Sequence, residues 1–286
     1  MASVRMAFLR IVEVLPPVFP ESSSKDDHIL VGTRMERFAE ELKRIRDFAD
    51  VFLLANVKNP RLLKLDLVQT AIFLQKDLRI RVAPVTVVRN QNRSQFLSTV
   101  LTGVVAGLDS MMIAWGDDLP ASAMTSNVRD FPNLASAIRE ASLIRSRTKT
   151  TTRLLSPVDL DSLADARGVF RARERIKSGA DLLLAQPPTT TLGGVFEIHA
   201  SLILRAGLKR KVLPNVFHFH GEQDIRRYES MFGWKLPDEL HKAAREGERG
   251  LIEEERDVVH RLRKEKFPGV YLSTRGRPEI ARRLLS

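Results

Sequence analysis

The chain has 286 residues, of which 43% are hydrophobic and 28% charged, with a formal net charge of +11 and no cysteine. These numbers fit a folded globular protein and exclude a disulfide framework, a thiolate metal site and a cysteine nucleophile. No apolar run reaches the roughly 20 residues of a membrane span, and the N-terminal segment makes a poor signal peptide. A cytoplasmic protein without a membrane partner is therefore expected. Because its positive charges are scattered beside acidic residues, a solvated helix surface explains them better than a nucleic-acid partner.

Strand-like and helix-like segments alternate along the whole chain. The first strand, residues 7–14, is rich in β-branched residues, as buried parallel strands are, and Pro16 and Pro17 end it. The other predicted strands are residues 50–55, 79–88, 109–115, 150–155, 181–186, 211–217 and 268–273. Predicted helices lie at residues 34–49, 61–75, 94–107, 133–146, 164–179, 193–207, 222–233, 238–266 and 278–285.

This alternation predicts a parallel sheet covered by helices. Eight strand–helix units in 286 residues match an α/β fold of the (β/α)₈ TIM-barrel type, with one domain spanning residues 1–286. A doubly wound open sheet is the alternative. When such a sheet binds nucleotides it usually carries a Gly-rich first turn, and the chain has neither a GxGxxG motif nor a P-loop.

Polar residues follow the predicted strands, where a barrel has its active-site face. They are Glu13, Asn56, Arg89, Asn90, Asp117, Asp118, Gln186, His218, His220, Tyr271, Ser273 and Arg275. Glu13 stands out because a carboxyl group at the end of an apolar strand has a reason to hold its proton near neutral pH, which a general acid needs. A structural pairing of Glu13 with Arg10 or a neighbouring arginine is the alternative interpretation.

The stretch "HFH" raises a second hypothesis. If the strand continues through it, His218 and His220 lie on one face, with the spacing of a metal pair. A metal-dependent hydrolase would need a third ligand, such as Glu13 or Asp117. Asp117 or Asp118 in "GDDLP" could instead cap a helix.

Four stretches in order carry a family resemblance: "VEVLPP", "GLDSMMIAWGDDLP", "RERIKSGADLLLAQ" and "AGLKRKVLPNVF". Over almost its full length the chain resembles the methylenetetrahydrofolate reductases, (β/α)₈ barrels that use FAD. The resemblance implies reduction of a methylene-tetrahydrofolate, or a related tetrahydropterin, to the methyl form through bound FAD. NAD(P)H or a partner protein would supply the electrons, and a homo-oligomer is a further expectation from the family. A non-catalytic barrel subunit of a one-carbon enzyme complex is the remaining alternative.

The resemblance also implies roles for single residues. Glu13 matches the general acid that protonates the folate nitrogen, and Asp117 matches the aspartate near flavin and pterin. Gln186 matches the glutamine that contacts the pterin, and Arg175 lies where the family has a cation near the FAD phosphates. Further candidates are Arg89 and Gly116 for the cofactor and Tyr271 and Arg275 for the substrate.

Overall fold

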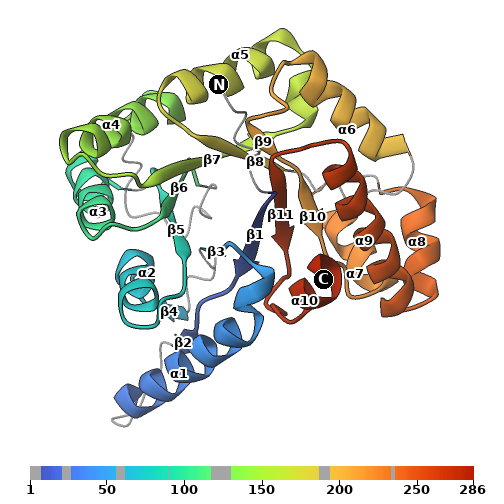
Figure 1. Cartoon of the computed structure of the whole chain (residues 1–286), viewed down its shortest axis with the longest axis horizontal. Coiled ribbons are helices and arrows are strands. Elements are labelled where there is room, and N and C mark those ends of the chain that lie inside the picture. The colour runs from blue at the N-terminus through green and yellow to red at the C-terminus, as the bar shows by residue number, and fades with distance from the viewer. Residues whose placement is uncertain are drawn as a thin grey trace, which may run out of the picture.

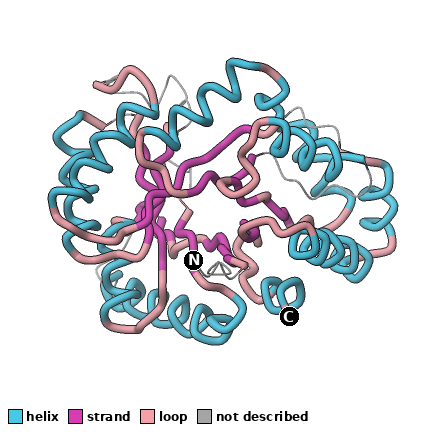
Figure 2. Tube along the Cα trace, turned by 45° about the horizontal axis from the view of Figure 1, so that its top comes forward, coloured by secondary structure: helices cyan, strands magenta, loops and turns pink. Residues whose placement is uncertain are grey.

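The computed structural model describes residues 8–20, 27–55, 62–89, 91–116, 130–186, 194–232 and 236–286. In these ranges nine parallel strands form a nearly closed barrel, and helices surround it (Figures 1 and 2). The predicted α/β TIM-barrel fold is therefore confirmed. No helix of the described ranges is both long and apolar enough to cross a bilayer.

All eight predicted barrel strands are present, one of them in two parts, so the described barrel has nine strands. They are β1 (Leu9–Val14), β3 (Val51–Leu54), β5 (Val82–Val87), β6 (Ser110–Ala114), β7 (Arg153–Asp159), β8 (Leu182–Gln186), β9 (Val212–Leu213), β10 (Asn215–Phe217) and β11 (Gly269–Ser273). Their order around the barrel is β10-β11-β1-β3-β5-β6-β7-β8-β9. The predicted strand 211–217 forms both β9 and β10, because Pro214 between them has no amide to donate. The ring therefore closes through this one segment.

The helices outside the barrel differ from the prediction in three places, the first being α1 (Asp27–Ile45), which was predicted at residues 34–49 and starts seven residues earlier. The helices are α1, α2 (Leu67–Lys76), α3 (Arg93–Val105), α4 (Leu134–Arg147), α5 (Ala166–Lys177), α6 (Gly194–Arg205), α7 (Glu222–Phe232), α8 (Asp238–Arg245), α9 (Glu248–Lys264) and α10 (Ile280–Leu285). The helix predicted from residue 61 is wrong at its start: Leu62–Lys64 is a strand, β4, paired antiparallel with β2 (Val18–Pro20). The helix predicted at 238–266 is two helices, because Gly247 takes a φ of 93° and breaks it.

Side chains of the barrel strands alternate between two cores. One set fills the barrel interior: Ile11, Val51, Leu53, Ala83, Met112, Leu155, Leu184, Leu213 and Tyr271. The residues between them, such as Val12 and Val14, pack outward against the helices. Because alternate residues of a strand share a face, Glu13 follows Ile11 into the barrel interior, at the carboxyl end of β1. The fold thus places a carboxyl group at the mouth of the barrel.

Gly168 gives a stability prediction for this fold. It lies in the first turn of α5, where a Cβ atom would stand 1.8 Å from the carbonyl oxygen of Ser162. We expect Gly168→Ala to lower the free energy of unfolding by about 3 kcal/mol, since backbone must move to admit the methyl group. Gly32 in α1 is the matched control, because no atom lies within 4 Å of its Cβ position. Gly32→Ala is expected to raise stability by about 0.5–1 kcal/mol. Urea unfolding measures both, and equal stability of the two variants would contradict the packing.

Candidate active site at the barrel mouth

Glu13 is held at the barrel mouth by its neighbours on β11. The hydroxyl group of Tyr271 donates a hydrogen bond to the Glu13 carboxylate, and Thr274 Oγ1 donates to the Glu13 carbonyl oxygen over 2.8 Å. The alternative pairing of Glu13 with Arg10 is wrong, because Arg10 forms its ion pair with Asp50, with Nη2 3.0 Å from Oδ1. Glu13 therefore has no cationic partner within the described part of the chain.

The surroundings of Glu13 favour its protonated form. Loss of hydration raises the pKa of Glu13 above its ordinary value of 4.5, although hydrogen bonds from Tyr271 and Ser273 act in the opposite direction. Tyr271 is only 2% exposed, and its own pKa lies well above 10.0, first because it is buried and second because Glu13 is close. At neutral pH Tyr271 is therefore a neutral donor, and Glu13 is suited to hold and release a proton.

Gln186 completes the polar group at the mouth. It is the last residue of β8, and its side chain lies close enough to Tyr271 to lower the pKa of the phenol. Ser273 Oγ lies 3.4 Å from the Tyr271 hydroxyl. We call Glu13, Gln186, Tyr271 and Ser273 the mouth cluster. All four of these residues were singled out from the sequence, but Tyr271 is buried and is not open to a ligand.

Two of the cofactor candidates lie together on the rim beside β5 and β6. The Arg89 amide donates to the carbonyl oxygen of Trp115 over 2.9 Å, and Gly116 follows Trp115. Gly116 has a φ of 88°, and a Cβ atom there would stand 2.2 Å from the Val87 side chain, so this position requires glycine. Asp117 lies outside the described residues, as do Asn56, Asn90 and Asp118, and the roles predicted for them stay predictions.

A pocket of about 1020 Å³ lies between α4 and α5, beside Trp115. Four arginines line it: Arg139, Arg167, Arg171 and Arg175. Arg175 is half-buried and donates to the carbonyl oxygen of Pro157 in β7, and burial and the nearby Arg171 lower its pKa. In the described ranges no acidic side chain forms an ion pair with the other three arginines. This arginine pocket has positive charge to offer to an anion, and only Arg175 of it was singled out from the sequence.

Within the described residues the two histidines gather no third metal ligand, and Asp117, one of the two ligands predicted for them, lies outside those residues. Both histidines follow the end of β10, and the His218 Nδ1 atom lies 2.8 Å from Glu255 Oε2 of α9, with both side chains buried. The His220 ring stands 5.3 Å from the His218 ring, centroid to centroid, and is exposed. Among the described residues no three His, Asp or Glu side chains gather as metal ligands would. Glu13, inside the barrel, does not join them.

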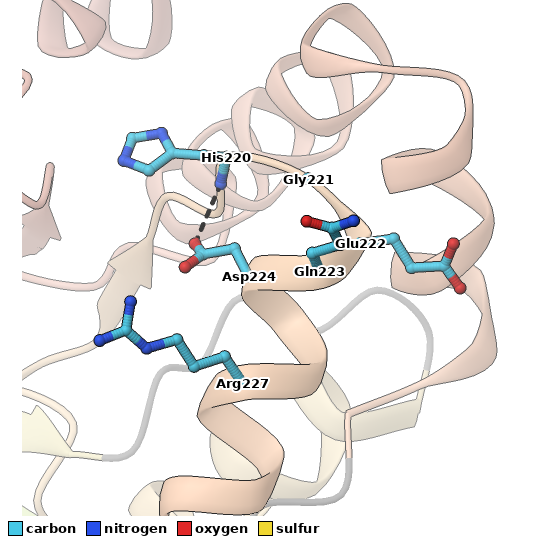
Figure 3. A pocket seen from close by; sticks show the side chains of 6 residues that line it. All are labelled: His220, Gly221, Glu222, Gln223, Asp224 and Arg227. Atoms are coloured by element: carbon cyan, nitrogen blue, oxygen red, sulfur yellow. Dashed lines mark hydrogen bonds between the residues drawn. The ribbon is translucent and has the colours of Figure 1, made fainter.

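A smaller hollow of about 500 Å³ lies where α7 begins (Figure 3). His220 and Arg227 line it, and the backbone amide of His220 donates to Asp224 over 3.2 Å. Arg275, the second substrate candidate, pairs with Asp224 and places its guanidinium group 4.4 Å from the centre of the Tyr228 ring. The charge of Arg275 is thus compensated by Asp224 within the protein.

The barrel, its polar mouth and the neighbouring pocket define the class of the protein as a TIM barrel with a carboxyl group at the active-site face. No protein-family model and no curated protein matches the sequence. A solved structure from Clostridium thermocellum, an uncharacterized protein described as binding two copies of 5-methyl-5,6,7,8-tetrahydrofolic acid, has a TM-score of 0.61 at 12% identity. The match covers 98% of this chain and 94% of that one. An EDTA monooxygenase from Chelativorans sp. BNC1 has a TM-score of 0.54 at 10% identity, over 97% and 92% of the two chains. At these identities the likeness shows the fold.

Proposed function

We propose that the protein is an oxidoreductase of the methylenetetrahydrofolate reductase type, which converts a methylene-tetrahydropterin to its methyl form. The observation that carries the proposal is the Glu13 carboxyl group, half-buried at the barrel mouth with a raised pKa and no cationic partner among the described residues. The motifs that resemble this family support the proposal, as does a barrel of the same fold described as binding methyl-tetrahydrofolate.

Glu13 would act as the general acid. A proton from its carboxyl group goes to a nitrogen of the methylene bridge, the carbon–nitrogen bond then breaks, and an iminium carbon is left that accepts hydride to become the methyl group. Burial favours the protonated form of Glu13, because loss of hydration raises the pKa of its carboxyl group above the ordinary value. Gln186, beside it at the end of β8, would hydrogen-bond the pterin edge.

The residues of the arginine pocket fit FAD. Arg139, Arg167 and Arg171 would hold the pyrophosphate, because their charges oppose its own and the N-terminal end of α4 lines the same pocket. Trp115 and Phe170 offer apolar surface to a ring system. When bound, the flavin supplies hydride transfer between the electron donor and the substrate. Arg175 is held by Pro157 and would add charge without turning to the ligand.

Arg139 provides a test of the pocket that does not depend on catalysis. We expect Arg139→Ala to weaken FAD binding about tenfold, because one charge-assisted contact to phosphate is removed. Arg147, exposed at the other end of α4 and outside the pocket, gives the matched control, and Arg147→Ala should bind FAD like the wild type. Quenching of flavin fluorescence measures both affinities. Equal loss in the two variants would point to general charge attraction and contradict a specific pocket.

Reconstitution tests the function as a whole. The protein is incubated with excess FAD, desalted, and its visible spectrum recorded; the bands are then bleached with a reductant and methylene-tetrahydrofolate is added. We expect the flavin bands to survive desalting and, once bleached, to return when methylene-tetrahydrofolate is added. Methyl-tetrahydrofolate should form in an amount equal to that of the reoxidised flavin. A protein that retains flavin but forms no methyl product would overturn the proposed reaction, and one that binds neither flavin nor pterin would favour the non-catalytic subunit.

A further inference from the structure

We infer that Tyr271 is a positioning residue that holds the carboxyl group of the acid Glu13 in place at the barrel mouth. Its side chain is 2% exposed and lies on the inner face of β11, so a ligand at the mouth cannot contact it. Any effect of Tyr271 on the reaction must therefore pass through the Glu13 carboxyl group that it bonds. The inference rests on the proposed function only in taking Glu13 as the acid.

The hydrogen-bonding capacity of a phenol fixes the direction of the bonds. A tyrosine hydroxyl has one proton to donate and can also accept. Its proton goes to Glu13, so its oxygen is left as an acceptor for Ser273.

Tyr271→Phe removes the hydroxyl group and keeps the ring. We expect kcat/KM for methylene reduction to fall about 10- to 100-fold, the effect of losing one hydrogen bond to an ionisable group. Because the Tyr271 hydrogen bond lowers the pKa of Glu13, its loss should also keep Glu13 protonated to higher pH. Infrared spectra measure the protonation of Glu13 directly, through the C=O band of its protonated carboxyl group. Glu13→Gln removes this band and so identifies it. In a plot of activity against pH, the fall in activity on the alkaline side should therefore occur at a higher pH in Tyr271→Phe than in the wild type.

The chain offers a matched control, because Tyr228 is its only other tyrosine and lies outside the mouth cluster. Tyr228→Phe should leave both the activity and the infrared titration like those of the wild type. If Tyr271→Phe folds and the Glu13 band titrates as in the wild type, the inference is wrong. A merely structural role of Tyr271 would lower stability without moving this titration.

A second measurement does not require Tyr271 to be replaced. In a Tyr228→Phe background Tyr271 is the one remaining tyrosine, and its ionisation can be followed by ultraviolet absorbance. Because Glu13 raises the pKa of Tyr271, Glu13→Gln in this background should lower the pH at which half of Tyr271 is ionised. An unchanged midpoint would overturn the inference. Neither titration needs substrate, so a failure of the reductase proposal would show separately, as normal titrations without methyl product.

Discussion

Glu13→Gln is expected to slow methylene reduction about 10²- to 10⁴-fold, the usual contribution of a general acid. Glutamine can still accept the hydrogen bond from Tyr271, so the mouth cluster keeps its shape, but it has no proton to give to the bridge nitrogen. Formation of methyl product with excess reductant measures the rate, and binding of methyl-tetrahydrofolate, which needs no proton transfer, should change little. Full activity in this variant would remove Glu13 from the mechanism.

Stability of the same variant separates lost chemistry from lost folding. Since burial raises the pKa of Glu13, the folded chain holds this proton more tightly than the unfolded chain. The Glu13 contribution to wild-type stability is therefore full below pH 4.5 and is lost as the pH rises through the raised pKa. Glutamine does not titrate. Urea unfolding across this pH range should show Glu13→Gln gaining stability relative to the wild type as the pH rises, and a variant that lost stability instead would contradict the raised pKa.

The sequence predicted the barrel well, for a physical reason. A strand buried on both faces reads as a short apolar run, and the chain has eight such runs between amphipathic helices. Strand ends of a barrel converge, so Glu13 and Gln186 could be placed near each other without knowledge of their contacts. The bond from Tyr271 to Glu13 was missed, because it depends on the register of β1 against β11, which sets Glu13 opposite Ser273.

The sequence analysis did not identify the arginine pocket or the buried Glu255, for two different reasons. Arg139 and Arg171 lie on exposed helix surface and look like solvated charge in the sequence; only the packing of α4 beside α5 brings them together. Glu255 could have been found. It falls on the apolar stripe of α9 with Leu251, Ile252 and Val258, and a carboxylate at such a position predicts a buried partner.

That buried partner is His218, and breaking the pair should cost about 3 kcal/mol of folding free energy. Glu255→Leu leaves the imidazole without its Nδ1 partner in a fully buried site, and His218→Phe strands the Glu255 carboxyl group in the same way. Burial raises the pKa of Glu255, because a site without water disfavours an uncompensated charge. Urea unfolding of each single variant at neutral pH measures the two losses.

The double variant His218→Phe/Glu255→Leu decides what the pair does. Replacing both partners by apolar side chains of similar size removes both buried ionisable groups, so we expect it to recover most of the stability that either single change loses. Such recovery means that His218 is committed to Glu255 and is not available as a metal ligand beside His220. Losses that simply add would show that the two side chains do not act as a pair, and His218 would again be open to a ligand.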